Sequence, residues 1–131
     1  MESAGFFRVS REAGRIQLQA MVLPSAEGLT VAIYGGDKPH VGAVALAVPR
    51  PSLMDPAKTS ATVSVLTLIG HKDDEIAKPA AEKLAKELEQ PVALVAGVHL
   101  DNPSQTEIDT VISLAGEIVD EIVLRFPSKG G

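Results

Sequence analysis

The first half of the chain alternates short apolar runs with turn residues, a pattern that predicts β-strands. Residues 15–22 alternate polar and apolar side chains, as a half-buried strand does. Residues 41–48 are more continuously apolar, which is typical of a central strand. Together the patterns predict strands over Phe6–Ser10, Arg15–Val22, Leu29–Tyr34, Val41–Val48 and Thr62–Ile69. Their composition makes Gly35–Pro39 a turn and Pro49–Pro56 a proline-rich loop.

The second half changes to the helical period. Residues 75–89 carry an apolar stripe, which predicts an amphipathic helix with Pro79 close to its start. The short apolar run Val92–Val98 is interpreted as a buried strand. A second helix follows, with two possible starts: Asn102 as the cap with proline after it, or the capping box of Ser104 and Glu107. Its apolar face is formed by Ile108, Val111, Ile112, Ala115, Ile118, Val119, Ile122 and Val123.

This order, βββββαβα, predicts an α+β fold in a single domain over residues 1–131. We expect a mainly antiparallel sheet of about six strands with both helices packed on one face. The simplest arrangement is a meander in which Leu29–Tyr34 and Val41–Val48 form a hairpin through the Gly35–Pro39 turn. A right-handed crossover through the first helix makes Val92–Val98 run parallel to Thr62–Ile69.

The same topology predicts that all three histidines of the chain lie at one end of the sheet. His40 lies beside the turn, His71 follows the fifth strand, and His99 ends the sixth. The strand directions place these three positions within roughly a dozen ångströms, two or three strand spacings. The starts of both helices and several charged residues come to the same end, namely Asp37, Lys72, Asp73, Asp74 and Asp101.

Three kinds of chemistry fit this end of the sheet. The imidazoles of His40, His71 and His99 could bind zinc or another divalent metal, as in a small metal-dependent enzyme. Gly70, His71 and Lys72 precede a helix start, where backbone N–H groups and the helix dipole favour an anion such as a phosphate. A histidine–carboxylate acid–base site is the third possibility, although no nucleophile is evident among the nearby serines.

Composition narrows the classes of partner. The chain has 131 residues, of which 45% are hydrophobic and 22% charged, with a net charge of −5 and few aromatic residues. An acidic chain without clustered Lys and Arg has no electrostatic footprint for nucleic acid. It contains no cysteine, which excludes disulfides and thiolate metal sites. No segment is long and apolar enough for a membrane span or a signal peptide, so we expect a soluble cytoplasmic protein.

One family resemblance is carried by motifs spread over the chain. Residues 35–53, GGDKPHVGAVALAVPRPSL, together with 64–67, 70–74 and 96–102, resemble the small D-type accessory proteins of non-oxidative hydroxyaryl-acid decarboxylases, the prenylated-flavin chaperone family. The resemblance extends over about residues 30–123 and keeps the motifs in order. It implies a non-catalytic protein that binds prenylated FMN made by a flavin prenyltransferase and delivers it to a UbiD-type aromatic or unsaturated acid decarboxylase.

With this resemblance, the flavin ring would need an aliphatic pocket and the phosphate would lie near the histidines. The predicted cofactor-binding residues are Asp37, His40, Arg50, His71, Lys72, Asp73, His99 and Asp101. Arg50 can make a bidentate contact with phosphate, but its loop should lie at the opposite end of the sheet. It would reach the site only from a second chain. The apolar strands and the long proline loop also predict a homodimer that shares a sheet face or edge.

Overall fold

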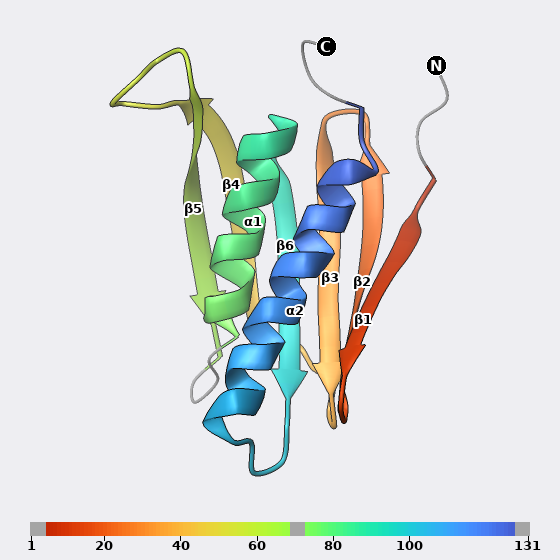
Figure 1. Cartoon of the computed structure of the whole chain (residues 1–131). Coiled ribbons are helices and arrows are strands. Elements are labelled where there is room, and N and C mark those ends of the chain that lie inside the picture. Colours follow the sequence, from red (N-terminus) through yellow and green to blue (C-terminus); the bar gives the residue numbers. More distant parts are fainter. Residues whose placement is uncertain (1–4, 69–72, 128–131) are drawn as a thin grey trace.

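The computed structural model of the protein describes residues 5–68 and 73–127, which form one sheet with two helices. The predicted α+β class, the order βββββαβα and the packing of both helices on one face are confirmed (Figure 1). The elements are β1 Phe7–Ala13, β2 Ile16–Ser25, β3 Gly28–Gly36, β4 Ala43–Pro51, β5 Thr59–Thr67, α1 Asp74–Leu88, β6 Val92–His99 and α2 Gln105–Leu124. In the part of the chain that the structure describes, no helix could cross a bilayer.

The predicted hairpin between the third and fourth strands is wrong. The strand order is β1-β2-β3-β6-β4-β5, so β6 lies between β3 and β4. It pairs in parallel with β3 and antiparallel with β4. The predicted strand directions nevertheless hold, because β5 is antiparallel to β4 and therefore runs in the same direction as β6.

The connection between β3 and β4 therefore crosses the end of β6 instead of making a tight turn. The backbone N–H of Asp37 donates to His99 O at 2.6 Å, and that of Gly42 donates to Ala96 O at 3.0 Å. Gly97 has no side chain where the connection passes, and a Cβ there would meet the carbonyl oxygen of His40. Gly36, with φ +77°, supplies the left-handed backbone conformation at which the connection begins.

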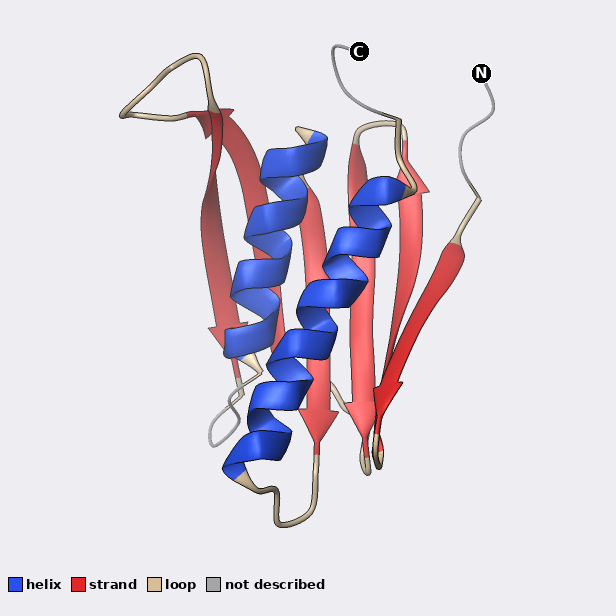
Figure 2. Ribbon diagram, in the orientation of Figure 1, coloured by secondary structure: helices blue, strands red, loops and turns tan. Residues whose placement is uncertain are grey.

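The core lies between the sheet and the two helices (Figure 2). Alternate residues of the central strands point toward the helices and are fully buried, as in the series Ala43, Ala45 and Ala47 of β4. Small residues there allow α1 to lie close to the sheet. The helices contribute the other half of the core with Ile76, Ala77, Ala80, Ala81, Leu84, Ala85, Leu88, Val111, Leu114, Ala115, Ile118, Val119 and Ile122.

The proline-rich segment differs from its prediction as a loop. Strand β4 continues through Pro49 to Pro51, and only residues 52–58 connect it to β5. The prolines are tolerated because β6 pairs with β4 only as far as Ala47. Beyond that point β4 has a partner on one side alone, and proline can occupy a position whose N–H is not needed. This connection lies at the end of the sheet opposite the β6–α2 connection (Figure 1).

The helices begin close to the predicted positions, α1 one residue before the predicted Glu75 and α2 after one of its two candidate caps. Of the two starts considered for α2, the structure has the capping box: Ser104 Oγ accepts from the Glu107 N–H at 3.1 Å, and Glu107 accepts from the Ser104 N–H at 3.0 Å. Helix α1 starts at Asp74 and contains Pro79 as its sixth residue. Proline removes one hydrogen bond, to the carbonyl of the exposed Glu75, which water can satisfy.

Candidate functional site

Two of the three histidines meet at the end of the sheet where β6 finishes. The ring centroids of His40 and His99 are 6.5 Å apart, and the rings are nearly perpendicular. His40 comes from the connection that crosses β6, and His99 is the last residue of β6. His71 lies outside the described residues, so the three-histidine cluster remains a prediction.

Asp73 ties this end of the sheet to the start of α1. Its side chain is only 4% exposed. One carboxylate oxygen accepts from the Val98 N–H at 2.9 Å, and the other lies 3.0 Å from His40 Nε2. The second ring nitrogen of His40 lies 3.0 Å from the carbonyl oxygen of Lys38. Asp73 therefore holds His40 in a defined orientation beside the strand end.

Asp37 and Asp101 belong to a second network at the same end of the sheet. Asp37 Oδ2 accepts from the Asp101 N–H at 2.9 Å and pairs with Arg15 Nη1 at 3.3 Å. The guanidinium of Arg15 also donates to the carbonyl oxygen of Asp101 at 2.9 Å. The Asp101 carboxylate in turn lies 3.1 Å from His99 Nε2. Asp37 is thus engaged within the chain, whereas the exposed Asp101 orients His99.

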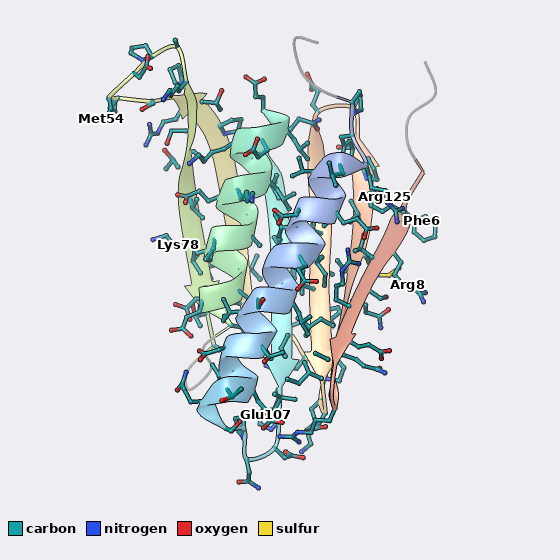
Figure 3. All side chains as sticks on the ribbon, viewed as in Figure 1. Phe6, Arg8, Met54, Lys78, Glu107 and Arg125 are labelled. Atoms are coloured by element: carbon teal, nitrogen blue, oxygen red, sulfur yellow. The ribbon has the colours of Figure 1, made fainter. Side chains whose placement is uncertain are left out.

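Arg15 completes this network by reaching the start of α2. It contacts both carboxylate oxygens of Glu107, from Nε at 2.7 Å and from Nη2 at 3.1 Å. The hydrogen bond from Arg15 and those from Ser104 lower the pKa of Glu107 from its ordinary value of 4.5 to about 2. Figure 3 shows Glu107 at the end of the molecule opposite Met54. The β1–β2 turn, the β3–β4 connection and the start of α2 are therefore linked.

A cavity of about 320 Å³ opens beside these networks, between the starts of α1 and α2 and the end of β6. Small-molecule sites range from about 300 to 1,000 Å³, so this cavity lies at the small end of the range. Its polar lining comes from Asp73, Glu75 and His99. The remaining lining residues are apolar: Ile76, Val98, Leu100, Pro103, Ile108, Val111 and Ile112.

The predicted cofactor-binding residues divide into four groups. Asp73 and His99 line the cavity, while Asp37, His40 and Asp101 belong to the networks around it. His71 and Lys72 lie outside the described residues. Arg50 lies near the far end of β4, where it donates to Thr62 Oγ1 at 2.8 Å and to the Pro51 carbonyl oxygen at 3.1 Å. Within one chain, Arg50 therefore does not share the site.

The described residues do not support the alternative of a metal-dependent enzyme. Over residues 5–68 and 73–127, no group of three or more histidine or carboxylate side chains is arranged to hold a metal ion. His40 and His99 each contact a neighbouring carboxylate.

Sequence reasoning missed the apolar wall of the cavity and the central position of Arg15. Residues such as Ile76, Ile108 and Ile112 were assigned to core stripes by their helical spacing. Ile108 and Ile112 are in fact exposed, and they line the cavity between the starts of the two helices and the end of β6. No local signal distinguishes such residues from the rest of the stripe. Arg15 was placed at the start of a strand without a predicted role.

Comparison with known proteins identifies related sequences and folds. Residues 12–126 match a family described as the prenylated flavin chaperone LpdD-like domain. Among solved structures, the chain resembles one from yeast titled "Crystal Structure of a Novel Chaperone Complex for Yeast 20S Proteasome Assembly". The TM-score is 0.57 with 15% identity, covering 89% of this chain and 94% of that one, which shows a shared fold. No curated protein gives a significant match.

Proposed function

The chain belongs to the family of prenylated flavin chaperones with an LpdD-like domain, and from this we propose that it binds prenylated FMN in the cavity beside His99 and delivers it to a UbiD-type decarboxylase. In this proposal a flavin prenyltransferase supplies the cofactor, and the chain acts in the cytoplasm as a homodimer without catalysing a reaction itself. The observation that carries the proposal is the apolar cavity at the starts of both helices.

The wall of the cavity suits the ring system of the cofactor. Prenylation enlarges the apolar part of the flavin, and an apolar surface gains free energy when aliphatic side chains remove it from water. Ile76, Val98, Val111 and Ile112 provide such a surface without any aromatic side chain. This agrees with a chain whose only aromatic residues are three Phe and one Tyr.

The phosphate of the cofactor needs positive partners, and the described lining of the cavity contains none with a permanent charge. Asp73 and Glu75 are acidic, and the guanidinium of Arg15 is engaged with Glu107. We therefore assign the phosphate to His71 and Lys72, which precede α1 in the sequence. The unpaired N–H groups and dipole of a helix start add to the attraction for an anion.

The size and openness of the cavity favour delivery over permanent storage. At about 320 Å³ it holds part of the cofactor, and the rest stays accessible to a partner. Ile108 and Ile112 at its rim are themselves partly exposed. A decarboxylase can therefore contact the cofactor before it leaves the chaperone.

An anaerobic titration with prenylated FMN tests both the apolar wall assigned to the ring and the residues assigned to the phosphate. Ile108→Glu puts a carboxylate into the apolar wall, and we expect it to weaken binding by about tenfold or more. Leu124→Glu introduces the same charge on the same helix at a position that is 83% exposed and away from the cavity. This control variant should bind prenylated FMN like wild type. His71→Ala and Lys72→Ala should each weaken binding by roughly ten- to a hundredfold, because a charge-assisted contact is lost.

Transfer to the apo-decarboxylase is measured with the same variants. Wild type should activate the enzyme, and a variant should do so only to the extent that it binds cofactor. If wild type binds and Ile108→Glu binds equally well, the cavity is not the ring site. If His71→Ala and Lys72→Ala both bind and deliver normally, the phosphate lies elsewhere. Absence of binding to wild type would contradict the chaperone function.

A further inference from the structure

The two edge strands of the sheet differ in how well they are protected. At one edge, β1 carries Arg8, Arg11 and Glu12 among its seven residues. Arg11 also pairs with Glu121 of α2 at 2.6 Å. Charged side chains along an edge strand discourage a further strand from pairing with it. At the other edge, β5 has the sequence TSATVSVLT, with no charged residue, proline or glycine. The β5 edge therefore lacks this protection.

The backbone of β5 presents unpaired groups along this edge. Among the described strands β5 pairs only with β4, and it lies at the margin of the molecule in Figure 1. Just beyond the end of β5, the Leu68 N–H donates to Gly42 O at 2.9 Å. Because hydrogen-bonded residues alternate along an antiparallel pair, the even-numbered residues of β5 bond to β4. The N–H and C=O groups of Ala61, Val63 and Val65 therefore face away from the sheet.

Two prolines of β4 support this assignment. Pro49 and Pro51 lie opposite Ala61 and Thr59. Proline has no N–H to donate, so it occupies positions where the ladder does not need one. The odd-numbered residues of β5 are thus the ones that do not bond to β4. A row of such unpaired backbone groups fits one kind of protein ligand, an extended segment that adds a strand to the sheet.

Helix α1 gives the β5 edge a charged border. Glu89, the residue after α1, accepts from Thr59 Oγ1 at 3.0 Å, so this side of the helix faces β5. Lys78 lies about three helical turns earlier on the same side, as Figure 3 shows. Its side chain is exposed and forms no ion pair with any residue that the structure describes. A strand added beside β5 would lie close to this ammonium group, which favours a carboxylate in the added segment.

The position of the β5 edge relative to the proposed flavin site indicates which partner it serves. Strand β5 runs in the same direction as β6 and finishes at the same end of the sheet, where His99 lines the cavity. His71 and Lys72, the residues assigned to the phosphate, follow β5 closely in the sequence. A partner whose strand pairs with β5 would therefore be held beside the cofactor that it receives.

We propose that the β5 edge is the docking site for the decarboxylase, which adds an extended, largely uncharged segment with a carboxylate near Lys78 as the seventh strand of the sheet. This inference rests on the proposed delivery of flavin, because it names the surface through which delivery occurs. The residues of the edge do not line the flavin cavity, so docking and flavin binding can be lost separately.

Hydrogen exchange, measured residue by residue, tests the edge in the free chain and in its complex with the apo-decarboxylase. In the free chain, the N–H groups of Ser64 and Leu66 should be protected by β4. Those of Val63 and Val65 should exchange about tenfold faster or more, because they face solvent. In the complex, the N–H groups of Val63 and Val65 should be slowed by about tenfold or more, since the added strand accepts from them.

A proline substitution tests the same pairing through affinity. Val63→Pro removes an outward N–H that β4 does not use and keeps an apolar side chain. It should weaken the complex with the apo-decarboxylase by about tenfold or more in sedimentation velocity, with the titration by prenylated FMN unchanged. Ser10→Pro on β1 is the matched control and should dock like wild type, because the Ser10 carbonyl also faces outward, toward the Arg11 guanidinium. Val65→Pro is the second variant if Val63→Pro does not fold.

Three results would overturn the proposal. The N–H groups of Val63 and Val65 could be as protected as that of Ser64 in the free chain, which would make a second copy the occupant of the edge. They could exchange equally fast with and without the apo-decarboxylase, or Val63→Pro could dock as well as Ser10→Pro, which would place docking elsewhere. Wild type could bind prenylated FMN and form no complex. Wild type that docks through β5 but binds no flavin would instead overturn the proposed flavin site and support the docking edge.

Discussion

At the scale of single residues, the sequence indicated which polar groups gather at one sheet end but not how each is used. His40, His99, Asp73 and Asp101 were placed there by strand direction alone. The structure gives Asp37 and Asp73 internal partners, the Asp101 and Val98 backbone N–H groups respectively. Such pairing depends on contacts between residues distant in the sequence, and no spacing rule predicts it.

Asp73 is the residue whose loss should disturb the site end most. Asp73→Ala leaves the partly buried N–H of Val98 without its acceptor and removes the carboxylate beside His40. We expect unfolding to become easier by roughly 1–3 kcal/mol, the cost of a buried group left unsatisfied. Urea denaturation measures this, with Asp74→Ala at the neighbouring position as the control. Equal effects of the two substitutions would show that the buried hydrogen bonds contribute no stability.

Two glycines provide a test with opposite signs. A Cβ at Gly97 would meet the His40 carbonyl oxygen of the crossing connection, so Gly97→Ala should destabilise the fold by about 1–3 kcal/mol. Gly116 lies in α2 with open space around its Cα, and Gly116→Ala should stabilise by about 0.5–1 kcal/mol. Thermal unfolding of both variants checks the prediction. A lower unfolding midpoint for Gly116→Ala than for wild type would disagree with the structure. So would an unchanged or higher midpoint for Gly97→Ala.

At the scale of elements, periodicity predicted the number, type and order of strands and helices. It failed at the link between β3 and β4, because Gly35–Pro39 has the composition of a hairpin turn. Strand β6 comes more than fifty residues later in the sequence and enters between these two strands. The position of β6 in the sheet depends on contacts between residues distant in the sequence, which the local composition of a turn does not predict. Strand β4 was also longer than predicted, since its prolines lie where the sheet gives it a single partner.

The link between the β1–β2 turn and α2 makes stability depend on pH. Glu107 has a pKa of about 2 in the folded chain and near 4.5 otherwise, chiefly because of Arg15. Its stabilising contribution is complete above about 4.5 and is lost as the pH falls toward 2. Glu107→Gln should therefore have a lower urea midpoint than wild type at pH 7, with the difference shrinking as the pH approaches 2.

Urea titrations at several pH values measure this dependence. Glu27→Gln, in the exposed β2–β3 turn, changes the same charge away from the network and should follow wild type at every pH. A difference between Glu107→Gln and wild type that stays constant from pH 7 to low pH would contradict an ionic link.

At the scale of the whole molecule, the proposed flavin site depends on how α1, α2 and β6 meet. The sequence suggested an aliphatic ring pocket through a family resemblance, and membership of the prenylated flavin chaperone family is confirmed. The cavity itself could not be predicted, because it lies between the starts of α1 and α2 and the end of β6, three segments that are distant in the sequence. Its lining combines residues from both halves of a helical pair with the last residues of a strand. Each of these residues looks like ordinary core in its own segment.

The most direct test of the account is the mass of the cofactor that is bound to the purified chain. The protein is produced together with a flavin prenyltransferase, purified without oxygen and analysed by native mass spectrometry. We predict that chains from these cells carry prenylated FMN at one per chain, and that chains produced without the prenyltransferase carry none. Protein without prenylated FMN in both preparations, or with unmodified FMN bound to the same extent, would contradict the account.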